Sequence, residues 1–559
     1  MTPFVSRSAV FLAATLLCSS TIHSALAQDS DATRMDAIEK QIRALQQELR
    51  QMRAEMAKRD AALRAAQQQA AEAKAAATRA AAAAPPLNTT VPAAGAAALA
   101  QAAPPPPAPP GKPGQFHLGG LTITLGGFIE AAGIFRSPNE TADISSTFSG
   151  IPLANTPQGH ETEFRGSARQ SRFTALVEGQ PDDVTTIAGY GEIDLQGAAP
   201  TANSNESNSY TPRLRQAYVT YDRTDWGVDI LAGQAWSLLT LDGHGITPRT
   251  EQTPLVIEGQ YVVGFTWARQ PQLRVVKQLI DNQLAVGVSV ENPQSVYSAG
   301  GYAASTYGTA NLVTLPDGEF ANLNNAGGNG FAPTVNYSDE VAPDVVAKLA
   351  WDPGFGHYEL YGIARFLHDR VDYVGGGHGD TTPAGGIGAA TVLPLIPGVL
   401  TLQASMLAGY GIGRYGAGQL PDATVRPDGS PAPIPEVQGM IGLVGHPIPA
   451  VDLYAYFGTE QESKTAFEVA GKGYGYGSPL FVNSGCDIEL SPLTCTDNTS
   501  GLAEGTLGAW WRFLHGNYGM LELGAQYAYI RRDVFPGVGG EPSVDDNMVF
   551  VSLRYYPFQ

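Results

Sequence analysis

The sequence has 559 residues, of which 43% are hydrophobic, and a formal net charge of −19 at pH 7. The acidic excess lies wholly in residues 116–559, and an acidic surface argues against nucleic acid as a partner. No segment after residue 27 carries the roughly 20 apolar residues that a transmembrane helix needs. Composition therefore excludes a helical membrane domain and disfavours nucleic-acid binding.

Residues 1–27 have the three parts of a secretory signal peptide. Arg7 supplies the positive charge, Ala9 to Cys18 form the apolar core, and Ala25-Leu26-Ala27 is a cleavage site of small residues. The apolar run is too short for a transmembrane anchor, and Leu17 is a poor residue to precede a lipidated Cys18. The segment predicts export.

The exported chain keeps two cysteines, Cys486 and Cys495, in a segment typical of a loop. Two cysteines outside the cytoplasm predict a disulfide bond. No histidine lies between or beside them, so a metal site is not expected here. The histidines elsewhere are scattered, and the sequence predicts neither a metal nor a cofactor.

Residues 28–84 carry apolar residues at alternating steps of three and four, which is the seam of a coiled coil. The seam does not decide between two and three associated helices. Residues 85–115 form an Ala/Pro-rich linker, which is expected to be extended and fairly stiff. The clearest seam positions are Ile38, Ile42, Leu45, Leu49, Met52 and Met56.

From residue 116 to residue 559, segments of about ten residues alternate between apolar and polar positions. Their connections alternate between short turns and long loops rich in Asn, Gly, Ser and Pro. This pattern predicts an all-β transmembrane barrel of about 16 antiparallel strands in up-and-down order, with seven short turns and eight long connections. The short turns are expected near residues 181–183, 223–225, 281–282, 352–354, 397–398, 446–449 and 515–518.

One face of several predicted strands is apolar and the other is polar. In the last strand, Val549, Val551, Leu553 and Tyr555 share the apolar face, while Arg554 points the other way. An apolar outside around a polar inside is expected of a barrel in lipid and not of a soluble sandwich. Aromatic residues near strand ends could form interfacial girdles, namely Trp226, Trp236, Trp351, Tyr518 and Tyr555.

The loop Ser237 to Glu258 lies between predicted strands Val228 to Trp236 and Tyr261 to Arg269. It is too long for a hairpin turn and lacks helical spacing. We expect it to fold into the lumen and narrow the pore. Its charged and titratable residues are Asp242, His244, Arg249, Glu251 and Glu258.

Arginines in or beside the predicted strands are the candidates for a selectivity filter. Because a charge that faces hydrocarbon costs roughly 2–4 kcal/mol near the midplane, most of them should face the lumen. There they can attract anions and bind carboxylates. The alternative is that each arginine pairs with a lumenal acid such as Glu192 or Asp194. The candidate pore-lining residues are Arg172, Arg213, Arg215, Arg269, Arg274 and Arg365.

No motif predicts an enzyme. Ser237, Asp242 and His244 are close in sequence, but proximity within one loop is not the geometry of a catalytic triad. Neither a nucleophile elbow nor a phosphate-binding loop occurs.

Several runs resemble the DcaP-like bacterial porins, which carry an N-terminal periplasmic coiled coil. They are RQSRF at 169–173, YGEIDLQG at 190–197, RLRQAYV at 213–219, AGQAWS at 232–237 and RQPQLR at 269–274. The resemblance implies a sixteen-stranded homotrimer whose inward-folded third loop narrows the pore. It also implies uptake of small anionic solutes such as dicarboxylates. The C-terminus departs from the usual terminal Phe, because Pro557 interrupts the pattern and Gln559 ends the chain.

Two hypotheses follow. In the first, the chain is a passive-diffusion porin in the bacterial outer membrane, surrounded by outer-membrane lipid, with its N-terminal arm in the periplasm. In the second, the barrel is a structural tether whose coiled coil grips peptidoglycan, with little flux.

Overall fold

The computed structural model describes residues 113–197, 211–280, 283–307, 309–326 and 336–559. The chain divides into two units, Met1–Pro106 and Pro107–Gln559, and the described residues all belong to the second. The signal peptide 1–27, the coiled coil 28–84 with its seam, and the linker 85–115 up to residue 112 lie outside the described residues and stay predictions.

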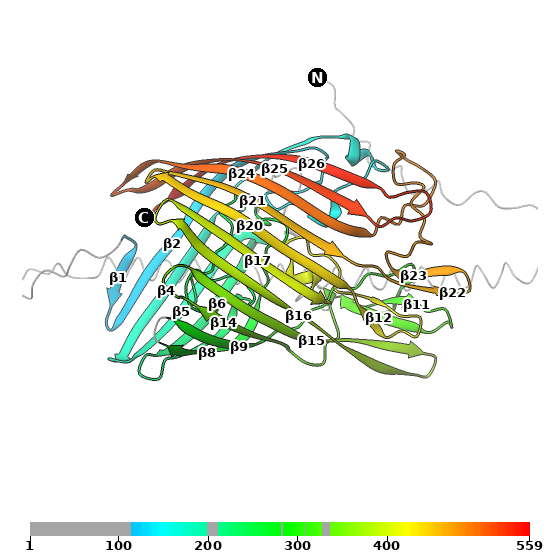
Figure 1. Cartoon of the computed structure of the whole chain (residues 1–559), viewed down its shortest axis with the longest axis horizontal. Coiled ribbons are helices and arrows are strands. Elements are labelled where there is room, and N and C mark those ends of the chain that lie inside the picture. The colour runs from blue at the N-terminus through cyan, green and yellow to red at the C-terminus, as the bar shows by residue number, and fades with distance from the viewer. Residues whose placement is uncertain (1–112, 198–210, 281–282, 308, 327–335) are drawn as a thin grey trace, which may run out of the picture. The chain divides into compact units, whose positions relative to one another are not determined.

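Sixteen strands of the described part of the chain close into one antiparallel barrel (Figure 1). Each barrel strand pairs with the next one along the chain, and the last pairs with the first, with Leu553 opposite Ala131. The predicted barrel and its up-and-down order are confirmed. The strands are β2 (Leu121–Arg136), β4 (Arg172–Asp182), β5 (Thr185–Gly197), β6 (Thr211–Arg223), β7 (Val228–Trp236), β8 (Arg269–Ile280), β9 (Leu284–Glu291), β14 (Asp344–Trp351), β15 (His357–Tyr373), β16 (Gly376–Ile396), β17 (Leu400–Tyr410), β20 (Pro435–Ile448), β21 (Val451–Glu462), β24 (Thr499–Gly516), β25 (Gly519–Val534) and β26 (Ser543–Tyr556).

The remaining short elements extend the barrel strands or lie in the long loops. They are β1 (Gln115–Leu118), β3 (Glu163–Ser167), β10 (Ala303–Tyr307), β11 (Ala310–Thr314), β12 (Phe320–Ala326), β13 (Asn336–Tyr337), β18 (Ala423–Val425), β19 (Pro431–Pro433), β22 (Thr465–Val469), β23 (Lys472–Tyr476) and the 3-10 helices η1 (Phe148–Gly150), η2 (Pro157–His160) and η3 (Gly413–Tyr415). Within the described ranges, no helix combines the length and the hydropathy needed to cross a membrane.

Six of the seven predicted short turns join barrel strands at one end of the barrel, here called the turn end, and the seventh, at 281–282, lies outside the described residues. The other end, the loop end, carries the longer connections, with one exception. β15 and β16 are joined by Val374 and Gly375 alone, because these strands have 17 and 21 residues and pair with each other along their full length. The loops used below are L1 (residues 137–162), L3 (237–268), L6 (411–434) and L7 (463–498).

The apolar strand faces lie outside, as predicted. On β26, Val549, Val551, Leu553 and Tyr555 are 36–47% exposed, whereas Arg554 on the opposite face is 9% exposed. The same outward apolar face is found on β25 with Leu523, Tyr527 and Tyr529, on β24 with Leu507, Trp511 and Phe513, and on β5 with Ile187 and Ile193. A closed barrel with this outer surface is built to span a lipid bilayer.

The expected aromatic girdle holds for four residues and is wrong for one. Trp226, Trp351, Tyr518 and Tyr555 are exposed on the outside or at the turn end. Trp236 is 4% exposed, because it points into the lumen and packs against Tyr261 and Phe265.

Candidate functional site

L3 is longer than predicted. The expected strand Tyr261 to Arg269 is wrong, since β8 begins only at Arg269 and residues 261–268 belong to the loop. Tyr261 and Gly264 have positive φ angles of 71° and 82°, which break an extended strand. Val262 and Val263 are both fully buried, so the segment packs on both sides and does not alternate.

Backbone amides tie L3 to polar side chains around the barrel wall. The bonds are Leu238 N to Glu291 on β9 (2.9 Å), Asp242 N to Glu359 on β15 (2.9 Å), Ile257 N to Gln526 on β25 (2.6 Å), Val263 N to Glu504 on β24 (2.8 Å) and Gly264 N to Glu460 on β21 (2.7 Å). Each such hydrogen bond contributes about 0.5–1.5 kcal/mol. L3 therefore crosses the lumen as a fixed partition, held in place by four wall carboxylates and the side-chain amide of Gln526.

The first part of L3 reaches the turn end. Lys348 on β14 is fully buried and donates to Thr240 O at 2.6 Å, to Asp242 at 3.1 Å and to Glu359 at 3.0 Å. Asp352, in the turn before β15, accepts from Gly245 N at 2.9 Å and lies 2.9 Å from the ring of His244. The tip of L3 is thus held at the turn-end mouth.

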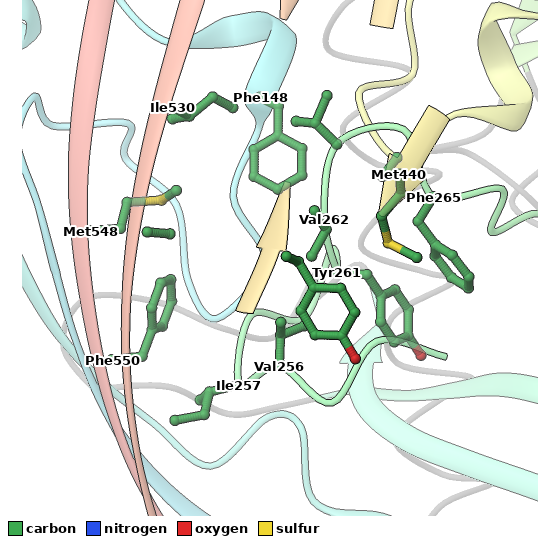
Figure 2. Close-up of a cluster of buried hydrophobic side chains, with 14 of the residues drawn as sticks. Phe148, Val256, Ile257, Tyr261, Val262, Phe265, Met440, Ile530, Met548 and Phe550 are labelled. Carbon is green, nitrogen blue, oxygen red and sulfur yellow. The ribbon is translucent and has the colours of Figure 1, made fainter. Parts of the chain in front are cut away.

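The second part of L3 packs with L1 in an apolar cluster. Figure 2 shows Phe148 of L1 beside Val262 of L3 and facing Met548 and Phe550 of β26. The inward fold of L1 was not predicted. The sequence could have predicted it, because L1 contains the apolar residues Ile144, Phe148 and Ile151, which are unusual in a loop that is exposed to solvent.

A buried ionic junction links these two loops to the wall. Arg136 on β2 donates to Ser146 Oγ at 2.9 Å and to Glu163 at 3.2 Å, and lies 3.9 Å from Glu258. Glu258 accepts from Ser146 N at 2.9 Å and from Ser146 Oγ at 2.6 Å. Burial raises the pKa of Glu258, while Arg136 and Ser146 counteract the shift. Glu258 therefore anchors L3 to L1 and does not face a permeating solute.

The accessible part of the lumen runs along β4. No residue of β4 is buried, whereas the inward-facing residues of β26 from Asp546 to Arg554 are all buried. Arg172 and Arg213 keep 22% and 32% of their side chains exposed here. Their carboxylate partners on β5 are covered, since Glu192 is 7% and Asp194 is 0% exposed. The surface offered to the lumen is therefore guanidinium, with the acids beneath it.

Three of the six candidate pore-lining arginines prove to be wall anchors. Arg215, Arg274 and Arg365 face inward but are only 1–2% exposed, because loops cover them. Arg215 bonds to Glu192, to Asp194 (3.1 Å) and to Tyr261 Oη (2.9 Å), and Arg274 bonds to Trp236 O (2.5 Å). Arg365 bonds to Asp344 (3.1 Å) and Asp422 (2.6 Å). Arg215 and Arg365 thus pair with lumenal acids, as the alternative predicts, and Arg213 pairs with Asp194 as well while it stays partly exposed.

Arg269 differs from these three. Its guanidinium carbon lies 4.7 Å from the ring centre of Trp236 and 5.5 Å from that of Trp267. Among the described residues no carboxylate pairs with it, and its buried Nη1 has no hydrogen-bond partner. Aromatic faces attract a cation without cancelling its charge, so the positive charge of Arg269 persists.

The five expected constriction residues separate into anchors and lumen-facing groups. Asp242 and Glu258 are buried anchors, and His244 sits at the turn-end mouth with 59% of its side chain exposed. Arg249 lies 4.0 Å from Glu178 on β4, and both are about one-third exposed. Glu251 is half-buried and forms a β-bridge with Asp242. L3 therefore approaches β4 through Arg249.

The predicted disulfide between Cys486 and Cys495 is present in L7. Ser237, Asp242 and His244 bond to separate partners, namely Leu239 N, Lys348 and Asp352, and so form no triad. In the described part of the chain, no three or more His, Cys, Asp or Glu residues are grouped to hold a metal ion.

This barrel aligns with a solved outer-membrane channel. The outer membrane channel DcaP of Acinetobacter baumannii aligns with a TM-score of 0.55 and 16% sequence identity, over 78% of this chain and 98% of that chain. The chain has the DcaP fold. The fold implied by the sequence resemblance is therefore confirmed.

Two further solved structures align less well. The anion-selective porin from Comamonas acidovorans aligns with a TM-score of 0.41 and 10% identity, over 78% of this chain and 99% of that chain. Salmonella typhi OmpF aligns with a TM-score of 0.42 and 8% identity, over 79% and 99% of the two chains. No protein-family model and no curated protein sequence matches the chain.

Proposed function

We propose that the chain is an outer-membrane porin for passive diffusion of small hydrophilic anions, with dicarboxylates as the expected class. L3 narrows the lumen to the space along β4, and a solute passes between Arg249 of L3 and the arginines of β4 and β6. The loop end faces the outside of the cell and the N-terminal arm lies in the periplasm.

The observation that carries this proposal is the layering of charge beside β5. Arg172 and Arg213 are partly exposed, while Glu192 and Asp194 are buried under them. Planar guanidinium groups bind carboxylates through paired hydrogen bonds, and a row of arginines in a pore favours anions. The wall acids Glu291, Glu359, Glu460 and Glu504 are 0–4% exposed and do not face the solute. Glu178 on β4 is about one-third exposed, and Arg249 lies 4.0 Å from it.

Planar lipid bilayers test the proposal with the purified full chain. Stepwise conductance is expected, with a reversal potential in a KCl gradient that shows preference for chloride. The variant R172Q/R213Q should shift the reversal potential toward cations.

The matched control is R370Q/R531Q, which removes two exposed arginines that pair with Asp372 and Asp533. Its reversal potential should stay at the wild-type value. Absence of stepwise conductance would overturn the porin, and an unchanged reversal potential in R172Q/R213Q would remove these arginines from the filter.

The homotrimer and the peptidoglycan tether stay predictions, because both depend on the coiled coil at 28–84. Deleting residues 31–84 separates the hypotheses. Transport persists while trimers weaken if the arm only assembles or spaces the barrels. The envelope phenotype vanishes with the arm if the chain is a tether.

A further inference from the structure

A square of buried polar side chains lies on the inner wall at the loop end of β20 and β21. Glu436 is directly opposite Glu462, and Gln438 is directly opposite Glu460. All four face inward and are 0–7% exposed. Residues opposite each other or two apart on one face of a sheet are near neighbours, so four oxygen-bearing side chains share one small patch.

Most polar atoms of this square have no partner in the described chain. Both carboxylate oxygens of Glu436 and of Glu462, both amide atoms of Gln438, and Oε2 of Glu460 are buried without a hydrogen bond. Only Oε1 of Glu460 is used, by Gly264 N and Gly418 N. Buried polar groups in folded proteins are almost always bonded, so this concentration of unused atoms calls for a ligand.

Among the described residues, the loops that cover the square bring no cation close to Glu436 or Glu462. A Cβ placed on Gly416 of L6 would lie 2.3 Å from Gln438 Oε1 and 2.5 Å from Glu460 Oε2, so these two oxygens lie near each other against the backbone of L6. From L7, Tyr476 lies close to Glu462, but it gives its hydroxyl hydrogen to Thr499 O at 2.7 Å. The charged groups that act on Glu436 are Glu462, Glu460 and Asp422, which are all acidic.

Asp422 does not change this balance, because Arg365 pairs with it at 2.6 Å. Two neighbouring carboxylates that are buried without a counter-charge are strongly unfavourable. Either a shared proton or a bound cation can neutralise them. A proton between Glu436 and Glu462 would still leave Gln438 Oε1 and Glu460 Oε2 unbonded, whereas a hard cation uses carboxylate and amide oxygens together.

We propose that Glu436 and Glu462, with the amide oxygen of Gln438, bind a divalent cation of the Ca²⁺ type between the barrel wall and loops L6 and L7. Ca²⁺ takes about six to eight oxygen ligands at about 2.3–2.6 Å, and water commonly completes the shell. Glu436, Glu462 and Gln438 supply only part of that shell. Water fills the remaining positions and can donate a hydrogen bond to Glu460 Oε2. The bound ion would clamp both loops onto the wall.

The test uses the purified full chain in detergent, stripped with EDTA and dialysed into chelator-free buffer. Equilibrium dialysis with ⁴⁵Ca²⁺ should show one more bound ion per chain in the wild type than in the isosteric variant E436Q/E462Q. Ca²⁺ should raise the thermal unfolding midpoint of the wild type, because a ligand of the folded state stabilises it. The variant should lose this response.

The matched control is E468Q/E489Q, which removes two exposed carboxylates of L7. It should keep the wild-type response to Ca²⁺. Equal Ca²⁺ binding and an equal midpoint shift in the wild type and E436Q/E462Q would overturn the proposal. In that case the wild type should gain stability between pH 8 and pH 5 regardless of Ca²⁺, since a proton then neutralises the pair.

A second measurement needs no change at the acids, in case E436Q/E462Q does not fold. Tb³⁺ replaces Ca²⁺ at oxygen sites and emits when a nearby tyrosine is excited. Emission that Ca²⁺ competes away and that falls in Y476F supports the site beside Glu462. Tb³⁺ emission equal in the wild type and Y476F places the ion elsewhere and overturns the proposal.

Discussion

The guanidinium of Arg269 rests 4.7 Å from the centre of the Trp236 ring, at the loop ends of β8 and β7. This contact holds a positive charge at the lumen without an acidic neighbour to cancel it. We expect R269Q to lower the anion-to-cation permeability ratio by about two- to fivefold. A change of this size corresponds to the free energy of one partly screened interaction between two charges. Reversal potentials in planar bilayers measure the ratio. The control R531Q removes an exposed, paired arginine and should leave the ratio unchanged; a shift of equal size in both variants would assign the effect to net charge.

L3 packs directly against Gly458 on β21. A Cβ there would lie 1.7 Å from Val263 O, so G458A must push L3 away from the wall. Because the displaced loop moves into the lumen, we expect smaller single-channel conductance and stricter size exclusion, with the barrel intact. The control G505A, on the neighbouring strand, adds a Cβ with nothing within 4 Å. Wild-type conductance in G458A would show that L3 does not set the width of the pore.

Lys348 is the buried cation that holds the L3 tip. K348M leaves Asp242 and Glu359 without their shared partner, and breaking a buried ion pair in this way costs about 3–5 kcal/mol. Unfolding in guanidinium chloride should show a free energy of unfolding that is lower by this amount. Single-channel records should show larger current fluctuations, because L3 becomes mobile. K277M changes an exposed lysine at the turn end and should stay within about 0.5 kcal/mol of the wild type. A wild-type unfolding curve for K348M would contradict the anchoring role.

The attachment of L1 should depend on pH through Glu140. Burial raises the pKa of Glu140 from 4.5 to about 8, and Asp546 adds to the shift while Arg136 opposes it. The folded state therefore holds a proton that the unfolded state releases, and its contribution to stability is complete below about pH 4.5 and is lost as the pH rises through about 8. Limited proteolysis of L1 should accelerate from pH 6 to pH 9. The variant E140Q should show a flat profile, and a wild-type profile that is equally flat would contradict the prediction.

The strands and turns could be predicted because their signals are local. The outward face of a barrel strand must be apolar regardless of the rest of the sequence. The alternation around Val549 and Val551 therefore predicts both that this segment is a strand and which of its faces meets lipid. Turn residues such as Asp352-Pro353-Gly354 act within a few positions. The short connection between β15 and β16 was not predicted, because both strands continue beyond the segments that alternate between apolar and polar residues.

The interior could be predicted only in part, because its contacts join distant parts of the chain. Val263 N donates a hydrogen bond to Glu504, which is 241 residues away in the sequence, and no local sequence pattern predicts that bond. Arg213 and Arg365 both face inward from their strands, yet only the loops decide that the first stays partly exposed and the second is covered. The apolar run Tyr261 to Trp267 resembles a strand until its far-wall partners are known.

Because the amides of L3 end on carboxylates carried by β9, β15, β21 and β24, the loop and the cylinder form one inseparable module. A chimera that transplants L3 alone into a foreign barrel would leave its amides without acceptors. To change the width of the pore, one should therefore exchange L3 together with the wall carboxylates that it binds. Alternatively, one can substitute residues near Arg249 and leave the hydrogen bonds between L3 and the wall unchanged.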